Sequence, residues 1–213
     1  VQNKKIFGFG VRQNMVNWQN GAESFIDAVS SGSATPGGGA VGAFAAANGC
    51  ALAMMSVSVT MKMKSTDAET KKILNEVLDE FIILRDELKE CYINDAKAYE
   101  EYLSAKKLPA ASKERAEYLK EALAACAKVP LDTALKAVKT LQMTDEAEPR
   151  ISPVIKSDVI CARIMLKAAI ACSVENIKAN LPFIKDEALI KELEENIRFL
   201  QTFCNVLAFS SSW

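Results

Sequence analysis

The stretch that decides the fold is residues 66–109, which read TDAETKKILNEVLDEFIILRDELKECYINDAKAYEEYLSAKKLP. Apolar side chains recur in it every three or four residues, which is the spacing of one face of an α-helix. Thr66 and Glu69 fit a capping box at its start, and Leu108-Pro109 breaks the pattern at its end. We therefore predict one helix about 58 Å long. The apolar stripe consists of Ile73, Val77, Phe81, Leu84, Leu88, Cys91, Ala98 and Tyr102.

An uncharged segment precedes this helix, from Ala28 to Met61. It is long enough to span a bilayer, but its many glycines, serines and threonines favour a buried central helix that ends near Lys62. Small residues recur along it every four positions, and such a stripe lets another backbone approach closely. That suits a helix at the centre of the fold or at a subunit interface. The stripe consists of Gly38, Gly42, Ala46 and Cys50.

Four more helices are predicted from the same apolar spacing. In one of them Val129-Pro130 forms a kink or an end, because proline lacks the amide hydrogen that a helix interior needs. Residues 144–156 form a loop, and the last helix extends to about Leu207. The residues that begin the four helices are Asn20, Ser112, Ser157 and Asp186.

No segment has a convincing strand pattern, so the sequence predicts an all-α fold. We expect one domain over residues 1–213, a bundle of long helices with one kinked helix, preceded by an irregular segment at 1–19. The chain has 213 residues, of which half are apolar, and this is enough for one large core. The net charge is −1 and no block of five like charges occurs, which argues against a nucleic-acid or anionic-membrane partner.

The chain contains no histidine. This excludes a Ser-His-Asp triad, a Cys-His pair, haem bound through histidine and a Glu-x-x-His di-iron bundle. Acid–base chemistry must therefore use Asp, Glu, Lys, Tyr or Cys side chains. We expect no metal site.

The cysteines lie among apolar residues at helical spacing and form no C-x-x-C pair, so zinc and redox motifs are absent. We predict that they are small core residues in a reducing compartment. The N-terminal region lacks the continuous apolar run of a signal peptide, and we expect a cytoplasmic protein. The cysteines are Cys50, Cys91, Cys126, Cys161, Cys172 and Cys204.

Two features are candidates for a functional site. Residues 33–39 read SATPGGG, and such a run lets the backbone approach a ligand and leaves helix N–H groups open to an anion. The alternative is a tight turn into a helix. Asp95 lies on the apolar stripe, where desolvation raises the pKa of a carboxyl group into a range that suits acid–base catalysis. The alternative is a carboxylate paired with a lysine or a helix terminus.

Five weaker candidates have simple structural explanations as well. Asp158 can bind a ligand, or only complement the positive end of a helix dipole. Lys62 and Lys64 can hold a ligand carboxylate, or only provide positive charge at a helix C-terminus. Asn176 and Asn180 share one helix face, so they can hydrogen-bond a ligand or each other.

Taken together, these features resemble the formiminotetrahydrofolate cyclodeaminase and methenyltetrahydrofolate cyclohydrolase family. The resemblance covers about residues 20–205, and the ordered set of motifs is more specific than any one of them. Lys64 keeps the place of a lysine in the family's Gly-Lys-Lys-Lys-Tyr run. The matching motifs are SATPGGGAV at 33–41, Asp95 with Tyr99, Leu108-Pro109, Val129-Pro130-Leu131, Ser157-Asp158, Ala168-Ala169 and NIKANL at 176–181.

The resemblance implies an all-α homodimer that binds a tetrahydrofolate derivative as substrate, without a tightly bound cofactor. The chemistry is at the carbon that bridges N5 and N10. Because no transferase domain is fused here, we favour 5,10-methenyltetrahydrofolate cyclohydrolase. The alternatives are formiminotetrahydrofolate cyclodeaminase, which releases ammonia and forms the methenyl compound, and a non-catalytic folate-binding helical protein.

The resemblance also suggests roles for individual residues. Asp95 is a candidate general acid or base, Asp158 a carboxylate that positions substrate or water, and Lys64 a partner for the substrate carboxylate or a proton carrier. Asn176 and Asn180 are expected to line the pocket. The glycine loop is expected to pack against the pterin or the glutamate tail through its backbone; its residues are Thr35, Pro36, Gly37, Gly38 and Gly39.

Overall fold

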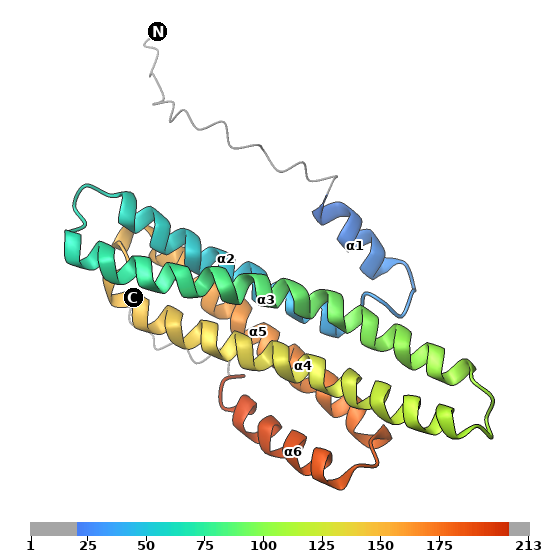
Figure 1. Ribbon diagram of the computed structural model, residues 1–213. Helices are drawn as coiled ribbons and strands as arrows, with labels where there is room; N and C mark the ends of the chain where they lie inside the picture. Colours follow the sequence, from blue (N-terminus) through green and yellow to red (C-terminus); the bar gives the residue numbers. More distant parts are fainter. Residues whose placement is uncertain (1–20, 205–213) are drawn as a thin grey trace. The chain divides into compact units, whose positions relative to one another are not determined.

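The computed structural model describes residues 21–204 (Figure 1). Among these residues the chain forms α-helices and short 3₁₀ turns but no strand, so the all-α prediction is confirmed. The chain divides into two compact units, residues 1–34 and 35–213. The predicted irregular segment 1–19 and the predicted cap Asn20 lie outside the described residues.

The described part of the first unit contains one helix, α1 (Ala22–Ser30), which begins after Gly21. None of its residues is buried: Ile26 is 53 % exposed and Val29 38 % exposed. The chain turns after this helix at Gly32, whose φ of 79° lies in the left-handed region that glycine adopts without strain.

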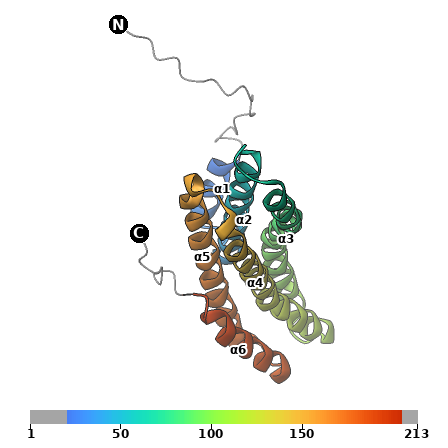
Figure 2. The same cartoon turned by 90° about the vertical axis from the view of Figure 1, so that its left-hand side faces the viewer.

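The second unit is a helical bundle. It consists of α2 (Gly38–Lys62), α3 (Ala68–Lys107), α4 (Lys113–Ala147) and α5 (Lys156–Asn180), with α6 (Glu187–Gln201) packed against α4 and α5. The end-on view in Figure 2 shows the four long helices side by side. α2 contacts α3, α4 and α5, and α4 contacts these helices and α6 as well. The largest fully buried side chains include Phe81, Leu88, Leu166, Ile170 and Leu193.

The small-residue stripe of α2 is used inside this bundle. Gly42, Ala46 and Cys50 are buried, and a methyl group on Gly42 would lie 3.2 Å from the Cβ atom of Cys172 in α5. Of the two predicted settings for the stripe, the centre of the fold is therefore the one found. α2 is the one described helix that is long and apolar enough to cross a membrane, but half of its most apolar window is buried in the bundle.

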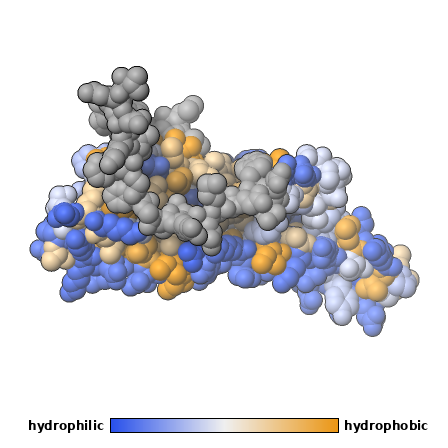
Figure 3. Space-filling view, turned by 90° about the horizontal axis from the view of Figure 1, so that it is seen from above, coloured by the Kyte–Doolittle hydropathy of each residue, from blue (hydrophilic) through white to orange (hydrophobic). Residues whose placement is uncertain are grey.

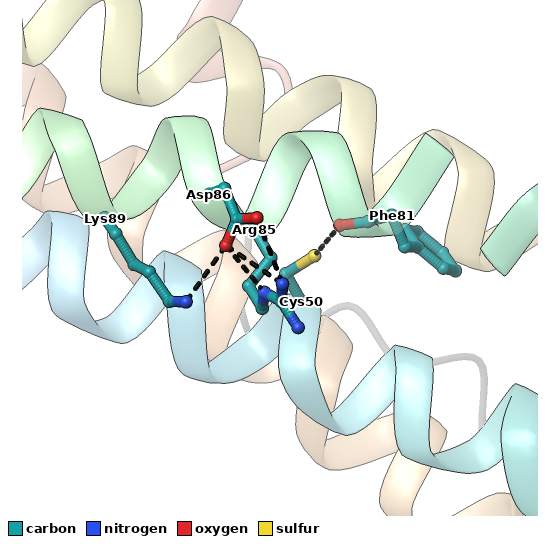
Figure 4. A network of polar contacts seen from close by, with 5 residues as sticks. All are labelled: Cys50, Phe81, Arg85, Asp86 and Lys89. Carbon is teal, nitrogen blue, oxygen red and sulfur yellow. Dashed lines mark hydrogen bonds and ion pairs between the residues drawn. The ribbon is translucent and has the colours of Figure 1, made fainter. Parts of the chain in front are cut away.

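The Cys50 thiol joins α2 to α3 by donating a hydrogen bond to the Phe81 carbonyl at 3.4 Å (Figure 4). Burial raises the pKa of Cys50 to about 12, so the thiol stays protonated at neutral pH. Nearby on α3, hydrogen bonds from Arg85 and then Lys89 lower the pKa of Asp86 to about 2.

The prediction that all cysteines are core residues is partly wrong. Cys50 and Cys91 are buried, whereas Cys161 and Cys172 are exposed. The remaining two, Cys126 and Cys204, are half-buried, and all six thiols are free. Helical spacing does not separate a core face from an outer face when both are apolar, as in α5.

Two predicted helix starts are corrected. α3 is capped by Asp67, whose side chain accepts from the Thr70 amide at 2.8 Å, and not by Thr66. The Thr66 hydroxyl instead donates to the Thr60 carbonyl at 2.7 Å, at the end of α2. α5 begins at Lys156 without a side-chain cap, because a 3₁₀ turn, Pro153–Ile155, runs directly into it. Ser157 therefore lies inside the first turn.

The other differences concern helix lengths. α4 does not end at Pro130 but continues to Ala147, into the predicted loop; a kink at Pro130 stays a prediction. α6 begins after Asp186 as predicted but ends at Gln201, and Leu207 lies outside the described residues.

On the face drawn in Figure 3, polar residues line the long edge of the molecule and separate apolar patches interrupt them.

Candidate functional site

The first turn of α2 and Asp95 of α3 meet at very close range. A methyl group built on Gly39 would lie 2.0 Å from Oδ1 of Asp95 and 2.7 Å from its Cγ atom. The carboxylate therefore occupies the space that any larger residue at position 39 would need. The backbone amide of Ala40, in the same turn, donates a hydrogen bond to this carboxylate. Thus the glycine run and Asp95, which are 56 residues apart in the chain (95 less 39), form one site.

Burial makes the Asp95 carboxyl a weaker acid than a free aspartic acid. Desolvation raises its pKa, and the hydrogen bond from the Ala40 amide opposes that shift only in part. The predicted direction of this pKa shift is confirmed. A raised pKa brings a carboxyl group closer to the pH range in which acid–base catalysis is most efficient.

Asn176 of α5 lies on the other side of the same turn. A methyl group on Gly38 would be 3.1 Å from its side-chain nitrogen. That nitrogen donates to the Cys172 carbonyl at 2.8 Å, one turn earlier in α5, which fixes the side chain along its own helix. The start of α2 therefore lies between a carboxylate and a carboxamide from two different helices.

The residues that lead into this turn are half-buried. They are Thr35, Pro36 and Gly37, and the Thr35-Pro36 peptide bond is cis. Gly37 is the N-cap of α2 and makes no side-chain cap bond; its carbonyl accepts from the Val41 amide at 3.0 Å. Because no side chain caps this end, its first amides are available to other acceptors, and the Ala40 amide uses Asp95.

A family model and three relatives match this chain. The model described as formiminotransferase-cyclodeaminase matches residues 21–199. This chain belongs to the formiminotransferase-cyclodeaminase family. Formimidoyltransferase-cyclodeaminase from Gallus gallus is 29 % identical over 178 residues, which are 82 % of this chain and 33 % of that protein. The chain thus spans about a third of the length of that relative.

Two further similarities cover most of both proteins. Methenyltetrahydrofolate cyclohydrolase from Methylorubrum extorquens is 28 % identical over 180 residues, which are 81 % of this chain and 86 % of that protein. The crystal structure of formiminotetrahydrofolate cyclodeaminase from Thermotoga maritima matches with a TM-score of 0.76 and 26 % identity, over 85 % of this chain and 88 % of that one.

In this member of the formiminotransferase-cyclodeaminase family, two of the three predicted catalytic residues lie far from Asp95 within one chain. Lys64 follows the last turn of α2, whereas Asp95 faces its first turn. The Ser152 amide donates to Thr60 Oγ1 at 3.1 Å, so the chain just before α5, and with it Asp158, lies at the same end as Lys64. The two ends of α2 are about 36 Å apart.

The side-chain nitrogen of Asn180, the last residue of α5, contacts two backbone carbonyls of the protein. This nitrogen lies 3.0 Å from the Cys126 carbonyl of α4 and 2.8 Å from the Asn176 carbonyl. Its two N–H groups therefore face protein carbonyls, and only the side-chain oxygen is left for a ligand.

Sequence reasoning missed Cys126 and a groove beside it. Burial raises the pKa of the Cys126 thiol, and the negative charges of Asp95 and Glu101 raise it further. The thiol donates to the Ala98 carbonyl at 3.5 Å, one turn after Asp95 in α3. A groove of about 620 Å³ lies between α3 and α4, with Lys97, Glu101 and Tyr118 among its lining residues; Cys126 and Asp95 do not line it. Cys126 is one apolar residue among many in a helical pattern, and no local signal distinguishes it.

Proposed function

We propose that this chain is a folate enzyme that acts at the carbon bridging N5 and N10, most simply as a 5,10-methenyltetrahydrofolate cyclohydrolase. The observation that carries the proposal is the half-buried Asp95 carboxyl, held against the glycine-rich first turn of α2 with a raised pKa. The cyclohydrolase relative supports the reaction, because the similarity covers most of that protein as well as most of this chain.

Water addition to the methenyl carbon requires proton transfer in both directions. A base takes a proton from the attacking water, and a tetrahedral carbon that carries a hydroxyl group forms. An acid then protonates N5 as the carbon–N5 bond breaks, and the hydroxyl group gives up its proton to solvent as the carbonyl forms. This yields the 10-formyl compound and, over the whole reaction, releases one proton. One carboxyl group with a raised pKa can perform both steps, since it is ionised for the first and holds the transferred proton for the second.

The second candidate reaction is cyclodeamination of 5-formiminotetrahydrofolate, which the name of the Thermotoga maritima relative favours. Its tetrahedral carbon carries an amino group in place of the hydroxyl group, and ammonia leaves. The same carboxyl group can protonate the departing nitrogen. The start of α2 is expected to bind the substrate through Thr35–Gly39 and Asn176.

The functional unit that we propose is a homodimer in which α2 and α5 form the interface. Apolar side chains are exposed on the outer side of α5: Ile164 is 37 % exposed, and Cys161 and Cys172 are exposed. No charged residue lies in α2 before Lys62. An exposed apolar face of this kind on neighbouring helices is typical of a contact with another protein.

A two-fold axis at the middle of α2 would make the two copies of this helix antiparallel. The last turn of α2 in one subunit would then lie beside the first turn of α2 in the other. Lys64 and Asp158, which are near that last turn, would lie near the Asp95 carboxylate of the other subunit. Each site would combine Asp95 from one subunit with Lys64 and Asp158 from the other. This arrangement gives all three predicted catalytic residues a role, which one chain alone does not.

The reaction is tested by supplying 5,10-methenyltetrahydrofolate and 5-formiminotetrahydrofolate separately. The methenyl chromophore is followed in both assays, and ammonia release in the second. We expect the protein to consume 5,10-methenyltetrahydrofolate faster than it forms this compound from 5-formiminotetrahydrofolate. A much faster formimino reaction would instead establish the cyclodeaminase. Tight folate binding without turnover of either compound would favour the non-catalytic alternative.

The shared site is tested by mixing two inactive variants, Asp95→Asn and Lys64→Ala. Random exchange of subunits gives heterodimers in which one site is intact, so about a quarter of the wild-type activity should return. Mixing Asp95→Asn with Asp95→Ala is the matched control and should restore none. If mass spectrometry shows that heterodimers form but the mixture of Asp95→Asn and Lys64→Ala regains no activity, the shared site is contradicted.

A further inference from the structure

The proline inside α4 leaves one backbone carbonyl without its helical partner. In an α-helix the amide of each residue donates to the carbonyl four residues earlier. Pro130 has no amide hydrogen, so the carbonyl of Cys126 lacks the bond that an amide at position 130 would donate. A partly buried carbonyl that is left unpaired is costly, and a donor from elsewhere is needed.

Asn180 supplies that donor from a different helix. Its side-chain nitrogen lies 3.0 Å from the Cys126 carbonyl, and the same nitrogen lies 2.8 Å from the Asn176 carbonyl in its own helix. Asn180 is the last residue of α5, and a 3₁₀ turn with Pro182 follows it. The contact therefore fixes the end of α5 against the middle of α4.

This contact lies directly behind the candidate site. Asn176, which faces Gly38, is one helical turn before Asn180. Cys126, whose carbonyl accepts from Asn180, donates its thiol to the Ala98 carbonyl of α3 at 3.5 Å, one turn after Asp95. The helices that carry the carboxylate and the carboxamide thus meet at Cys126.

We propose that Asn180 is a positioning residue that replaces the hydrogen bond Pro130 removes from α4, and that it thereby holds Asn176 and Asp95 in register on the two sides of Gly38 and Gly39. The role in turnover rests on the proposed folate activity, whereas the replacement of the hydrogen bond does not. The competing role is direct contact between Asn180 and the substrate.

The hydrogen-bond replacement is tested by a double-mutant cycle with Asn180→Ala and Pro130→Ala. In the wild-type background Asn180→Ala leaves the Cys126 carbonyl unpaired, and we expect Tm to fall by roughly 4–8 °C. In Pro130→Ala the helix supplies its own amide to that carbonyl. Asn180→Ala should then lower Tm by no more than about 2 °C. Equal shifts in the two backgrounds would overturn the proposal.

Two further variants make the cycle specific. Asn196→Ala is a matched control, because Asn196 donates to the carbonyl four residues earlier, that of Glu192, at 2.9 Å, in a helix without proline. Its effect on Tm should be small and independent of residue 130. Asn180→Asp keeps the shape but turns an acceptor toward two carbonyls, so it should lower Tm at least as much as Asn180→Ala at neutral pH. An unchanged Tm in Asn180→Asp would overturn the proposed donor role.

Turnover separates positioning from substrate contact. At a temperature where every variant is folded, Asn180→Ala should lower kcat/KM about tenfold or more, and adding Pro130→Ala should restore it to within about threefold of the Pro130→Ala value. Recovery of Tm without recovery of kcat/KM would assign Asn180 to the substrate instead. A wild-type protein that turns over neither folate compound would refute the proposed function, while the melting cycle would still decide the role of Asn180.

Discussion

The Asp95 carboxylate occupies the position of the missing side chain of Gly39, with Oδ1 2.0 Å from where a Cβ atom would be. This relationship explains why a glycine lies in the first turn of α2, although glycine is a poor helix former. It also makes the position of Asp95 depend on residue 39. The two residues are therefore expected to respond together to mutation.

Gly39→Ala should displace the Asp95 carboxylate and break its hydrogen bond with the Ala40 amide. We expect a loss of about 1–3 kcal/mol in the free energy of unfolding, as for other overpacked sites, and a fall in kcat/KM similar to that of Asp95→Asn. Gly21→Ala is the matched control, because a methyl group there has no atom within 4 Å. Full activity in Gly39→Ala would refute the role of this contact.

Asp95→Asn should lower kcat about 10²-fold or more, the scale of acid–base catalysis, while the protein stays folded. The wild-type pH–rate profile should have an acidic limb that titrates above the usual aspartic acid pKa, because burial raises the pKa of Asp95. That limb should be absent from the residual activity of Asp95→Asn. Activity close to wild type in this variant would exclude Asp95 as the acid–base group.

The same shift has a consequence for stability. Because the folded state holds the Asp95 proton more tightly than the unfolded state, this group's contribution to stability decreases as pH rises from the unfolded pKa to the folded pKa. Asp95→Asn lacks this titration. Its stability relative to wild type should therefore increase across that window, as measured by urea unfolding between pH 4 and pH 8. A relative stability that falls with rising pH would mean that the pKa is lowered.

Gly42→Leu should destabilise the chain itself rather than a subunit contact. A methyl group at this position would already be 3.2 Å from the Cβ atom of Cys172 and 3.7 Å from the Ala169 carbonyl oxygen. We expect a loss of about 1–3 kcal/mol or more, because the α2–α5 pair must move apart. Ala188→Leu is the control, since Ala188 is exposed on α6, outside the α2–α5 pair. Selective loss of dimer in Gly42→Leu, without a lower Tm, would contradict this packing.

Asp158→Asn distinguishes a helix-terminus role from a role in the site. Asp158 lies in the first turn of α5, which has no side-chain cap, so its charge should stabilise that turn by about 0.3–1 kcal/mol. If Asp158 also completes the site of the partner subunit, kcat/KM should collapse while the melting temperature changes little. Loss of stability with full activity would leave only the helix-terminus role.

Much of this fold could be predicted from the sequence because helical periodicity is a local property. The spacing of apolar residues predicted α3 nearly to its ends, and the lack of charge predicted a buried helix that ends near Lys62, where α2 ends. Asp95 stood out because a carboxylate on an apolar stripe is costly unless something stabilises it. Neighbouring candidates for one cap could not be separated in this way: Asp67 caps α3 because Thr66 bonds to the end of α2.

The sequence alone determined the class of fold, the family resemblance and the two central elements of the site, the glycine run and Asp95. Only the tertiary structure decided that Gly39 makes room for Asp95, that Asn180 pairs with the carbonyl freed by Pro130, and that Lys64 and Asp158 lie at the opposite end of α2. The reason is physical. Periodicity fixes which face of a helix is apolar, but the register between two helices depends on side chains that are distant in sequence and meet only when the bundle packs.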